Sequence, residues 1–367
     1  MGGMMGEFRT PPVSVEIDRL TRRIGGATIL DSLSLHVAQG EFMVILGESG
    51  CGKTTLLRLI AGFAAPDGGT IQLGDMLVSG AGEQVPPEKR NLGIVFQSYA
   101  LWPHMSVAEN VGFGLDLAGL SRSAQGARIA QALAQVGLSG LAARRPADLS
   151  GGQRQRVALA RCLAKAPGLV LLDEPLANLD PGLRQSVRQE FVAMRRALGS
   201  TFLYVTHDQS EALALADRIA LLNKGRLEQC GAPQTLYRTP ATAHVARFIG
   251  DGMLVPAVLL GPKEGAGFPV ELGGQRLRVR ATPGQAPGIV TLCLRAHDLA
   301  LVPAGTPESL TAVAGDALYQ GSYWRVSVRV PTLSDRLLDV ETRQSPPEAG
   351  SAVGLQVLDG WVIPAEA

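Results

Sequence analysis

Short apolar runs alternate with segments of helical periodicity between residues 13 and 249. Such runs predict buried strands of a parallel sheet, and their alternation with helices predicts an α/β domain. The expected strands are 13–20, 29–37, 42–46, 92–96, 169–172, 201–206, 219–222 and 226–229. The expected helices are 53–61, 123–136, 151–165 and 181–198, with Val157, Leu159, Ala160 and Leu163 facing inward.

The pattern changes after residue 249, where Pro and Gly become frequent and helical periodicity fades. Short β-rich runs at 254–260, 277–280, 289–294 and 324–330 predict a small second domain of the β-barrel type. We therefore expect a disordered tail over residues 1–12, an α/β domain over 13–249 and a β domain over 250–367. Residues 233–249 are expected to form a helical connection.

Composition narrows the class of protein. Lys and Arg number 34 against 33 Asp and Glu, so the net charge of +1 gives no long-range attraction to nucleic acid, and we expect no such partner. The hydrophobic fraction is 46 %, yet no apolar run reaches the ~18–20 residues of a membrane helix, and no signal-peptide pattern is present. Cys51, Cys162, Cys230 and Cys293 form no CxxC pair, which indicates reduced thiols in a cytosolic protein.

Residues 47–54 read G-E-S-G-C-G-K-T, directly after one expected strand and at the start of an expected helix. This pattern in this context is typical of a loop that binds nucleotide phosphates, because its glycines let backbone N–H groups turn toward them. Lys53 is expected on the β- and γ-phosphates, Thr54 on Mg²⁺, and Thr55 as a secondary phosphate contact. The expected nucleotide-binding residues here are Gly47, Glu48, Ser49, Gly50, Cys51, Gly52, Lys53, Thr54 and Thr55.

Polar side chains follow three of the expected core strands. After 169–172, Asp173 is the candidate for holding Mg²⁺, and Glu174 would point the other way if the strand continued, where it is the candidate for polarising water. Gln97 follows 92–96 as a candidate for metal or water contact, and His207 follows 201–206 as a candidate for a hydrogen bond to the γ-phosphate. A lone Gln or His is more often structural, so these two depend on the motifs around them. The candidate metal residues are thus Thr54, Gln97 and Asp173, and the candidate catalytic residues are Glu174, His207 and Gln97.

Leu149-Ser150-Gly151-Gly152-Gln153 lies between the phosphate loop and the carboxylates. Ser150, Gly151 and Gly152 precede a helix expected to start near Gln153, so they can present a hydroxyl and bare N–H groups to an anion. One chain already has a complete phosphate loop, so a second anion cradle is redundant within it. We therefore expect a head-to-tail homodimer in which Ser150, Gly151, Gly152 and Gln153 of one copy contact the ATP of the other.

In this order the three motifs resemble the ATPase cassette of ABC proteins, and the resemblance covers about residues 13–249. It implies a mixed sheet core with a helical subdomain, and hydrolysis of ATP with Mg²⁺. Asn178-Leu179-Asp180 resembles the D-loop at the dimer seam, with Asp180 as the D-loop residue. The run 96–104 with Glu109-Asn110-Val111 is similar to the Q-loop region of importer ATPases. In that family this region receives the coupling helix of a transmembrane subunit, which implies two permease subunits bound through residues 97–110 and, indirectly, a solute-binding protein.

The C-terminal part resembles the OB/TOBE-like β domain of the maltose, polyamine, sulfate, ferric-iron and phosphonate importer ATPases. The resemblance is carried by L-R-A-H-D at 294–298 and Y-Q-G-S-Y at 319–323. Ala296-His297 stands where these relatives usually have Pro-Glu. Such domains stabilise the ATPase dimer or receive regulatory signals in that family.

One departure from the family concerns the adenine base. The relatives usually place an aromatic residue near position 24, whereas this chain has Arg22-Arg23-Ile24-Gly25-Gly26. Adenine is therefore expected on Ile24 or under an arginine guanidinium. We expect weaker discrimination between bases as a result.

Together these features predict the ATPase subunit of a binding-protein-dependent ABC importer, on the cytoplasmic side of the inner membrane. Three alternatives fit less well. A DNA-repair or chromosome-maintenance ATPase needs a long insertion in the cassette, and a translation factor needs two cassettes; an exporter ATPase is disfavoured by the TOBE-like tail and by the absence of a fused membrane domain. The solute stays open among ferric iron, a polyamine, a phosphonate, sulfate and a sugar, because other subunits select it.

Overall fold

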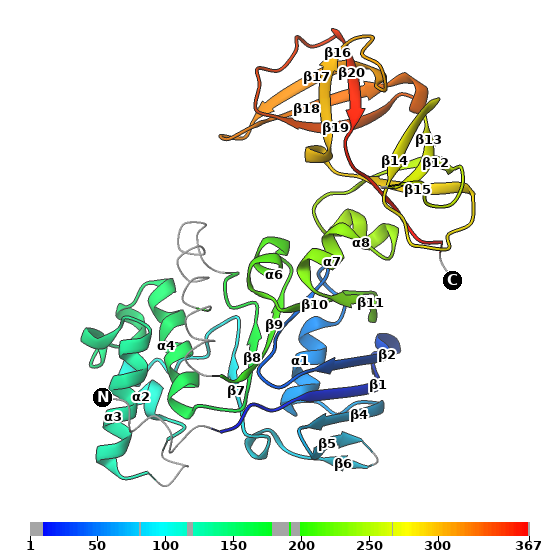
Figure 1. The fold of residues 1–367 in the computed structure, drawn as a ribbon. Coiled ribbons are helices and arrows are strands. Elements are labelled where there is room, and N and C mark those ends of the chain that lie inside the picture. The colour runs from blue at the N-terminus through cyan, green and yellow to red at the C-terminus, as the bar shows by residue number, and fades with distance from the viewer. Residues whose placement is uncertain are drawn as a thin grey trace. The chain divides into compact units, whose positions relative to one another are not determined.

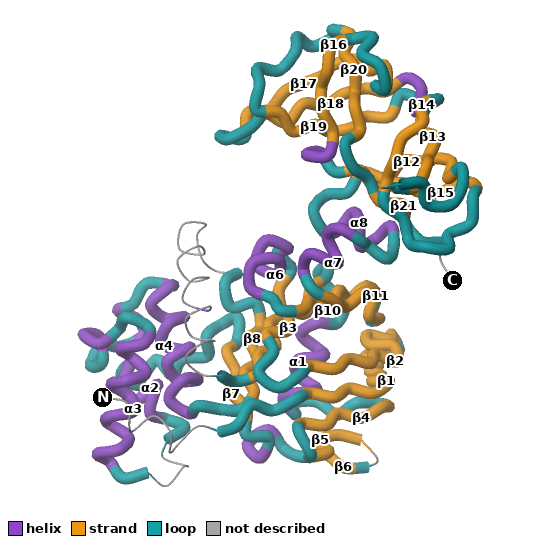
Figure 2. Tube along the Cα trace, viewed as in Figure 1, coloured by secondary structure: helices purple, strands orange, loops and turns teal. Residues whose placement is uncertain are grey.

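The computed structural model describes residues 10–80, 82–115, 120–177, 191, 199–265 and 267–365. The candidate Asp180 and the helix expected at 181–198 lie outside these residues, except for Phe191. By its internal contacts the chain divides into two compact units, Met1–Pro233 and Gln234–Ala367, each with its own hydrophobic core (Figures 1 and 2). The segment expected as a helical connection belongs, apart from Pro233, to the second unit.

A six-stranded sheet in the order β11-β10-β3-β9-β8-β7 forms the centre of the first unit (Figure 1). Its strands are parallel except for β11 at the edge, and every residue of β3, β8 and β9 is buried, as expected for strands covered on both faces. The bounds are β3 (Phe42–Leu46), β7 (Leu92–Val95), β8 (Leu169–Asp173), β9 (Thr201–Thr206), β10 (Arg218–Asn223) and β11 (Arg226–Gly231). The carboxyl ends of the parallel strands meet at one edge, which is where ligands bind in open α/β sheets.

A second, antiparallel sheet in the order β2-β1-β4-β5-β6 shares a hydrophobic core with the first sheet and with helix α1. Alternating buried and exposed residues along β2 show that this sheet buries one face. The bounds are α1 (Lys53–Ala61), β1 (Val15–Ile24), β2 (Ala27–Val37), β4 (Gly68–Leu73), β5 (Met76–Gly80) and β6 (Glu83–Gln84). Helix α1 ends at Gly62, whose φ of 88° is left-handed and whose N–H caps the last turn.

Three mutually packed helices form a helical layer beside the sheets (Figure 2). They are α2 (Val107–Gly112), α3 (Arg122–Gln135) and α4 (Gly151–Lys165), with the 3₁₀ turns η1 (Pro87–Lys89), η3 (Ser139–Leu141) and η4 (Pro146–Asp148) in the connections. Ser106, Ser121 and Ser150 cap the three helices through their hydroxyls. One more helix of the first unit, α6 (Gln209–Leu215), follows β9.

The second unit joins two short helices to two five-stranded antiparallel sheets, in the orders β14-β13-β12-β15-β21 and β16-β20-β17-β18-β19. One hydrophobic core contains residues of both sheets. The two α-helices are α7 (Pro233–Arg238) and α8 (Ala243–Phe248), and the 3₁₀ turns are η5 (Ala296–Asp298) and η6 (Pro331–Leu333). The strands are β12 (Met253–Leu259), β13 (Phe268–Leu272), β14 (Gln275–Val279), β15 (Gly288–Leu294), β16 (Leu299–Pro303), β17 (Leu310–Tyr319), β18 (Trp324–Val330), β19 (Arg336–Thr342), β20 (Ala352–Val357) and β21 (Trp361–Val362).

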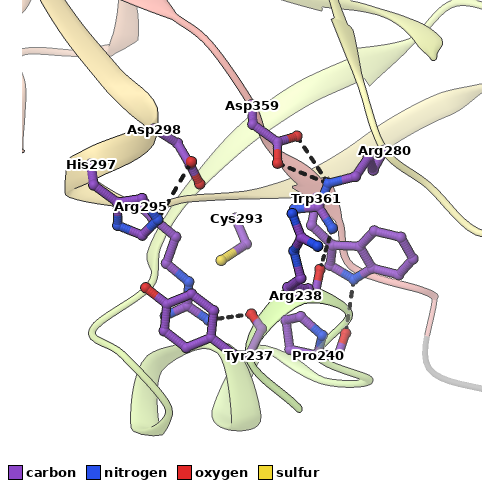
Figure 3. Close-up of a pocket in the computed structure, with 10 residues that line it drawn as sticks. All are labelled: Tyr237, Arg238, Pro240, Arg280, Cys293, Arg295, His297, Asp298, Asp359 and Trp361. Carbon is purple, nitrogen blue, oxygen red and sulfur yellow. Dashed lines mark hydrogen bonds and ion pairs between the residues drawn. The ribbon is translucent and has the colours of Figure 1, made fainter. Parts of the chain in front are cut away.

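Three side chains from the β part of this unit donate hydrogen bonds to backbone carbonyls around α7 and α8, and we call Arg280, Arg295 and Trp361 the carbonyl clamp (Figure 3). Arg295 is buried, donates to the carbonyls of Ala246 and Ile249 and, at 2.8 Å, to that of Tyr237. Its guanidinium also lies 4.2 Å from the Tyr237 ring centroid. These contacts explain how a cationic side chain is buried without a carboxylate partner among the described residues.

Arg280 and Trp361 also donate hydrogen bonds to backbone carbonyls around α7 and α8. Arg280 donates to the Arg238 carbonyl at 2.6 Å and pairs with the carboxylate of Asp359 at 2.9 Å, while Trp361 Nε1 donates to the Pro240 carbonyl at 2.9 Å. A cavity of about 70 Å³ lies among these side chains, lined also by Cys293, His297 and Asp298 (Figure 3). The clamp therefore makes α7 and α8 part of the C-terminal unit.

The sequence predicted the fold class correctly. Strands at 42–46 and 324–330 and helices at 53–61 and 151–165 have the predicted bounds, and the four predicted inward positions of α4 are buried. The sequence reasoning did not identify β4, β5 and several strands of the second unit, where apolar residues are interrupted by Gly, Pro and charged residues. No helix among the described residues is long and apolar enough to cross a membrane.

Candidate nucleotide-binding site

The loop 47–54 connects the carboxyl end of β3 to the start of α1. Lys53 folds back over it, and its Nζ donates to the carbonyl oxygens of Gly47 and Glu48 at 2.8 and 2.9 Å. A Cβ on Gly47 would lie 2.4 Å from a backbone oxygen of β10, and one on Gly52 would lie 2.7 Å from a side-chain carbon of β2. The loop's own packing therefore requires glycine at both positions.

Gly50 is glycine for a different reason. Its φ is 83°, and no atom of the protein lies within 4 Å of where a Cβ would stand. Lys53 is 5 % exposed, and among the described residues no carboxylate pairs with it. A buried cation without an acid, beside open space at a helix N-terminus, fits an anionic ligand such as a nucleotide phosphate.

Thr54 and Asp173 bring two oxygen ligands together at this edge. The Thr54 hydroxyl donates to Asp173 Oδ1 at 3.3 Å, although the two residues come from α1 and from the end of β8. Burial raises the pKa of Asp173, and the hydrogen bond from Thr54 partly opposes this. Among the described residues no three His, Cys, Asp or Glu side chains cluster as metal ligands, so this pair suits a cation completed by phosphate and water, which is how Mg²⁺ is usually bound.

Glu174 and His207 form the second contact of the site. The His207 Nδ1 lies 3.1 Å from Glu174 Oε1. Glu174 was predicted to point away from Asp173 if the strand continued, but β8 ends at Asp173. Glu174 has a left-handed φ of 43°, and its N–H donates to the Val205 carbonyl of β9 at 3.0 Å. This turn aims the carboxylate toward the residue that follows β9.

A buried carboxylate that the sequence reasoning did not single out supports His207. Glu211 Oε2 accepts from the Tyr204 hydroxyl at 2.8 Å and from the Thr206 hydroxyl at 2.7 Å. Asp208 caps α6 by accepting from the N–H groups of Ser210 and Glu211. The signal in the sequence was the spacing of Asp208 and Glu211, which is typical of a helix start. These bonds fix the backbone on both sides of His207.

Ser150 is the N-cap of helix α4, which begins at Gly151, as predicted from its periodicity and two residues before Gln153. Its hydroxyl accepts from the Gln153 N–H at 3.3 Å, and the Gln153 side chain accepts from the Ser150 N–H at 3.0 Å, which is a complete capping box. A Cβ on Gly151 would meet no atom within 4 Å, so the fold itself does not require glycine there. Among the described residues no hydrogen bond or ion pair joins Ser150, Gly151, Gly152 or Gln153 to the phosphate loop.

Ile24 lies at the end of β1, and its side chain is 53 % exposed. Of the two arginines that could support adenine instead, Arg22 donates to the Ala65 carbonyl at 3.0 Å and pairs with Asp67 at 3.4 Å, while Arg23 is exposed. The guanidinium of Arg22 is therefore already engaged with the protein.

The segment after Gln97 is held by side chains of two helices. Gln97 is exposed and lies two residues after the end of β7. Asn110 of α2 is fully buried and bonds the N–H and the carbonyl of Trp102 at 2.9 and 3.1 Å. Arg161 of α4 contacts the same segment, and sequence reasoning missed it; its signal was a charged residue between the buried Ala160 and Cys162.

The structure thus brings Lys53, Thr54, Asp173, Glu174 and His207 to one sheet edge, where Thr54 contacts Asp173 and Glu174 contacts His207. It leaves Ser150–Gln153 on a separate helix, and Asp180 lies outside the described residues. The sheet edge offers an anion site, two oxygen ligands for a cation and a carboxylate paired with an imidazole. Such a set suits the transfer of a phosphoryl group to water.

Comparison with known proteins gives two family matches. Residues 30–177 match the family described as ABC transporter, and residues 292–363 match the TOBE domain. The chain is 48 % identical to a spermidine/putrescine import ATP-binding protein PotA of Pseudomonas aeruginosa over 82 % of both chains. It is 43 % identical to sulfate/thiosulfate import ATP-binding protein CysA 2 of Chromobacterium violaceum over 89 % of this chain and 87 % of the relative. It is 40 % identical to PotA of Nitratidesulfovibrio vulgaris over 95 % and 96 %.

Proposed function

The chain belongs to the importer-type ABC ATPases with a C-terminal TOBE domain, and from this premise we propose that it powers solute uptake through separate membrane subunits. It is an ATPase. The observation that carries the proposal is the meeting of Lys53, Thr54, Asp173, Glu174 and His207 at one sheet edge. We infer the following roles for them.

Lys53 exchanges its two carbonyl acceptors for phosphate oxygens of ATP, and the N–H groups of 47–54 turn toward the same oxygens. Because the acceptors it leaves are neutral and the phosphates are charged, this exchange favours the nucleotide. The Thr54 hydroxyl and the Asp173 carboxylate, directly or through water, would hold Mg²⁺, which neutralises phosphate charge when bound. The exposed Gln97 is a further oxygen donor at the end of β7.

Glu174 orients the attacking water by accepting a hydrogen bond from it, and His207 fixes the Glu174 carboxylate through the contact of 3.1 Å. The left-handed turn at Glu174 holds this carboxylate beside Asp173 instead of across the sheet. His207 is half-exposed, so its other ring nitrogen is available to a γ-phosphate oxygen.

Two copies bind head to tail, and Ser150, Gly151, Gly152 and Gln153 of each contact the ATP of the other. The open space in front of Gly151 and the absence of contacts from this motif to its own phosphate loop, among the described residues, support this arrangement. Asp180 would lie at the same seam. Closure of the dimer moves two membrane subunits that dock through residues 97–110, and hydrolysis reopens it. The subunit would then work at the cytoplasmic side of the membrane and reach a solute-binding protein only indirectly.

The solute is selected by other subunits. The relatives' names include both polyamine and sulfate import, although a polyamine is a cation and sulfate an anion. Because the chain is similar to relatives of both names, we infer that it does not contact the solute. For the base, we infer that adenine rests on Ile24 or under the neighbouring exposed Arg23, since Arg22 is engaged with Asp67 and Ala65.

The central test replaces Glu174 by Gln, which keeps the shape but removes the charge that orients water. We expect Mg-ATP to bind normally and to hold a stable dimer in light scattering, while ATP turnover falls by about 10²–10⁴-fold. Unchanged turnover would remove Glu174 from this role. A variant that hydrolyses slowly and stays monomeric with ATP would argue against the shared site.

A further inference from the structure

The guanidinium of Arg161 bonds two consecutive carbonyl oxygens after Gln97. It donates to the Ala100 carbonyl at 2.7 Å and to the Tyr99 carbonyl at 2.9 Å. A fork with two parallel N–H groups defines direction as well as distance, which a lysine ammonium cannot do. Arg161 therefore fixes the position of this backbone relative to helix α4.

The backbone conformation of the segment suits this contact. Tyr99 has a φ of 64° and Ala100 a φ of 45°, and both values are left-handed and disfavoured for residues with a Cβ. Helical dihedrals of either hand turn consecutive carbonyls to the same side. The two carbonyls thus reach one guanidinium only in a conformation that needs support from outside the segment.

Aromatic and amide side chains make further contacts with the same segment and its neighbours. The Arg161 guanidinium lies 5.0 Å from the ring centroid of Trp102, whose ring lies 4.0 Å from that of Phe113. Asn110 bonds the carbonyls of Met105 and Ser106 at 3.2 and 3.0 Å, in addition to Trp102. Residues 99–106 are therefore held as one body between α2 and α4.

Arg161 shares helix α4 with the signature motif. The helix begins at Gly151, capped by Ser150, so Arg161 lies about three turns from the motif and on nearly the same side of the helix. An α-helix packed along its buried residues moves as a rigid rod over this length. A displacement of residues 99–106 thus becomes a displacement of Ser150.

We propose that Arg161 is a positioning residue that fixes residues 99–106 to helix α4, so that movement of this segment by a docked membrane subunit moves Ser150 relative to the ATP of the partner copy. This inference rests on the proposed function, because it needs docking through residues 97–110 and a signature shared between copies. It adds the physical link between the two. Arg161 touches neither the nucleotide nor the reacting atoms.

The test compares Arg161→Met, Arg161→Lys and a matched control, Arg128→Met. Arg128 of α3 also donates a hydrogen bond to a backbone carbonyl of α4, that of Ala164 at 3.3 Å, near the end of the helix farther from Ser150. For Arg161→Met we expect kcat for ATP hydrolysis to fall on the order of tenfold, with KM for ATP within twofold, because the phosphate loop is untouched. Arg161→Lys should fall between, and Arg128→Met should stay within twofold of the parent.

Hydrogen exchange measures the ATP-dependent protection of residues 97–106. Loss of a purely structural contact would not change this protection selectively. In the Glu174→Gln background, Mg-ATP should protect peptides covering residues 97–106 and the start of α4. Adding Arg161→Met should abolish the ATP-dependent protection at 97–106 and leave that at 47–54. Retained protection at 97–106, a normal kcat, or an equal loss in Arg128→Met would each overturn the inference. Ser150→Arg separates it from the proposed function: normal hydrolysis there refutes the shared site, whereas loss of hydrolysis with a normal Arg161→Met refutes only the link.

Discussion

Arg90 joins the end of α1 to the antiparallel sheet. It is 3 % exposed, and its guanidinium donates to the carbonyls of Leu59 and Ile60 in the last turn of α1, both at 2.8 Å. It also donates to β5 and its neighbouring loop, through the carbonyls of Val78 and Val85 and the hydroxyl of Ser79. Burial lowers the pKa of this guanidinium, and among the described residues it has no carboxylate partner. Neutral carbonyl and hydroxyl oxygens therefore compensate a buried positive charge.

Replacement by methionine keeps the aliphatic stem and removes all five of these bonds. Hydrogen bonds to a charged group contribute about 1.5–3 kcal/mol each, which gives ~7 kcal/mol at the low end. Returning the charge to water in the unfolded chain offsets several kcal/mol of this, so we expect a net loss of about 3–4 kcal/mol. In a unit of this size such a loss lowers the melting temperature by roughly 6–16 °C.

Calorimetry of the full chain measures this shift. The transition of the first unit is the one that rises when Mg-ATP is added to a Glu174→Gln background. Arg19→Met is the matched control, because the Arg19 side chain is 79 % exposed and pairs only with the adjacent Asp18 among the described residues; it should change stability by less than about 0.5 kcal/mol. Arg90→Lys should be at least as unstable as Arg90→Met, because it buries a charge with fewer acceptors. A lysine variant close to the parent, or a methionine variant within about 1 kcal/mol of it, would refute this account.

Two further predictions concern side chains at opposite extremes of exposure. Burial raises the pKa of Cys162 to about 12, so its thiol should resist iodoacetamide in the native protein and react after unfolding. Mass spectrometry of the labelled peptide would show this. Labelling of Cys162 before the partly exposed Cys230 would contradict it. Ile24→Tyr should lower KM for ATP by about fivefold or more by stacking on adenine, as steady-state kinetics with ATP and GTP would show; an unchanged KM for both would mean that the base does not rest there.

The central sheet and its loops were predictable because local signals agreed with the fold. The G-x-x-x-x-G-K-T run followed a wholly apolar strand, and glycines with positive φ stand where a Cβ would strike β2 or β10. The same agreement located β8 and β9, whose carboxyl ends carry Asp173 and His207. Such motifs are local in sequence and keep their meaning without tertiary contacts.

The unpredicted features depend on long-range contacts. Arg90, Arg161 and Arg295 each bond backbone carbonyls far away in sequence, and a carbonyl has no sequence signature. Glu174 was expected to follow strand alternation, but its left-handed turn is fixed by a bond to β9 that no local pattern reveals. In the second unit, the sequence indicated only a succession of short strands. The order of the strands within each sheet depends on the pairing of distant segments.

The carbonyl clamp has a consequence for how this protein tolerates mutation. Its acceptors are main-chain oxygens of α7, α8 and the turn between them, and these exist whatever side chains stand there. Substitutions along that stretch therefore leave the attachment intact if they preserve the backbone, the buried Leu236 and Val245 and the Tyr237 ring beside Arg295, while the donors Arg280, Arg295 and Trp361 are required. Apart from Tyr237, the attachment constrains side chains of the β part only, so the outer faces of the helices can be substituted without detaching them from the β sheets.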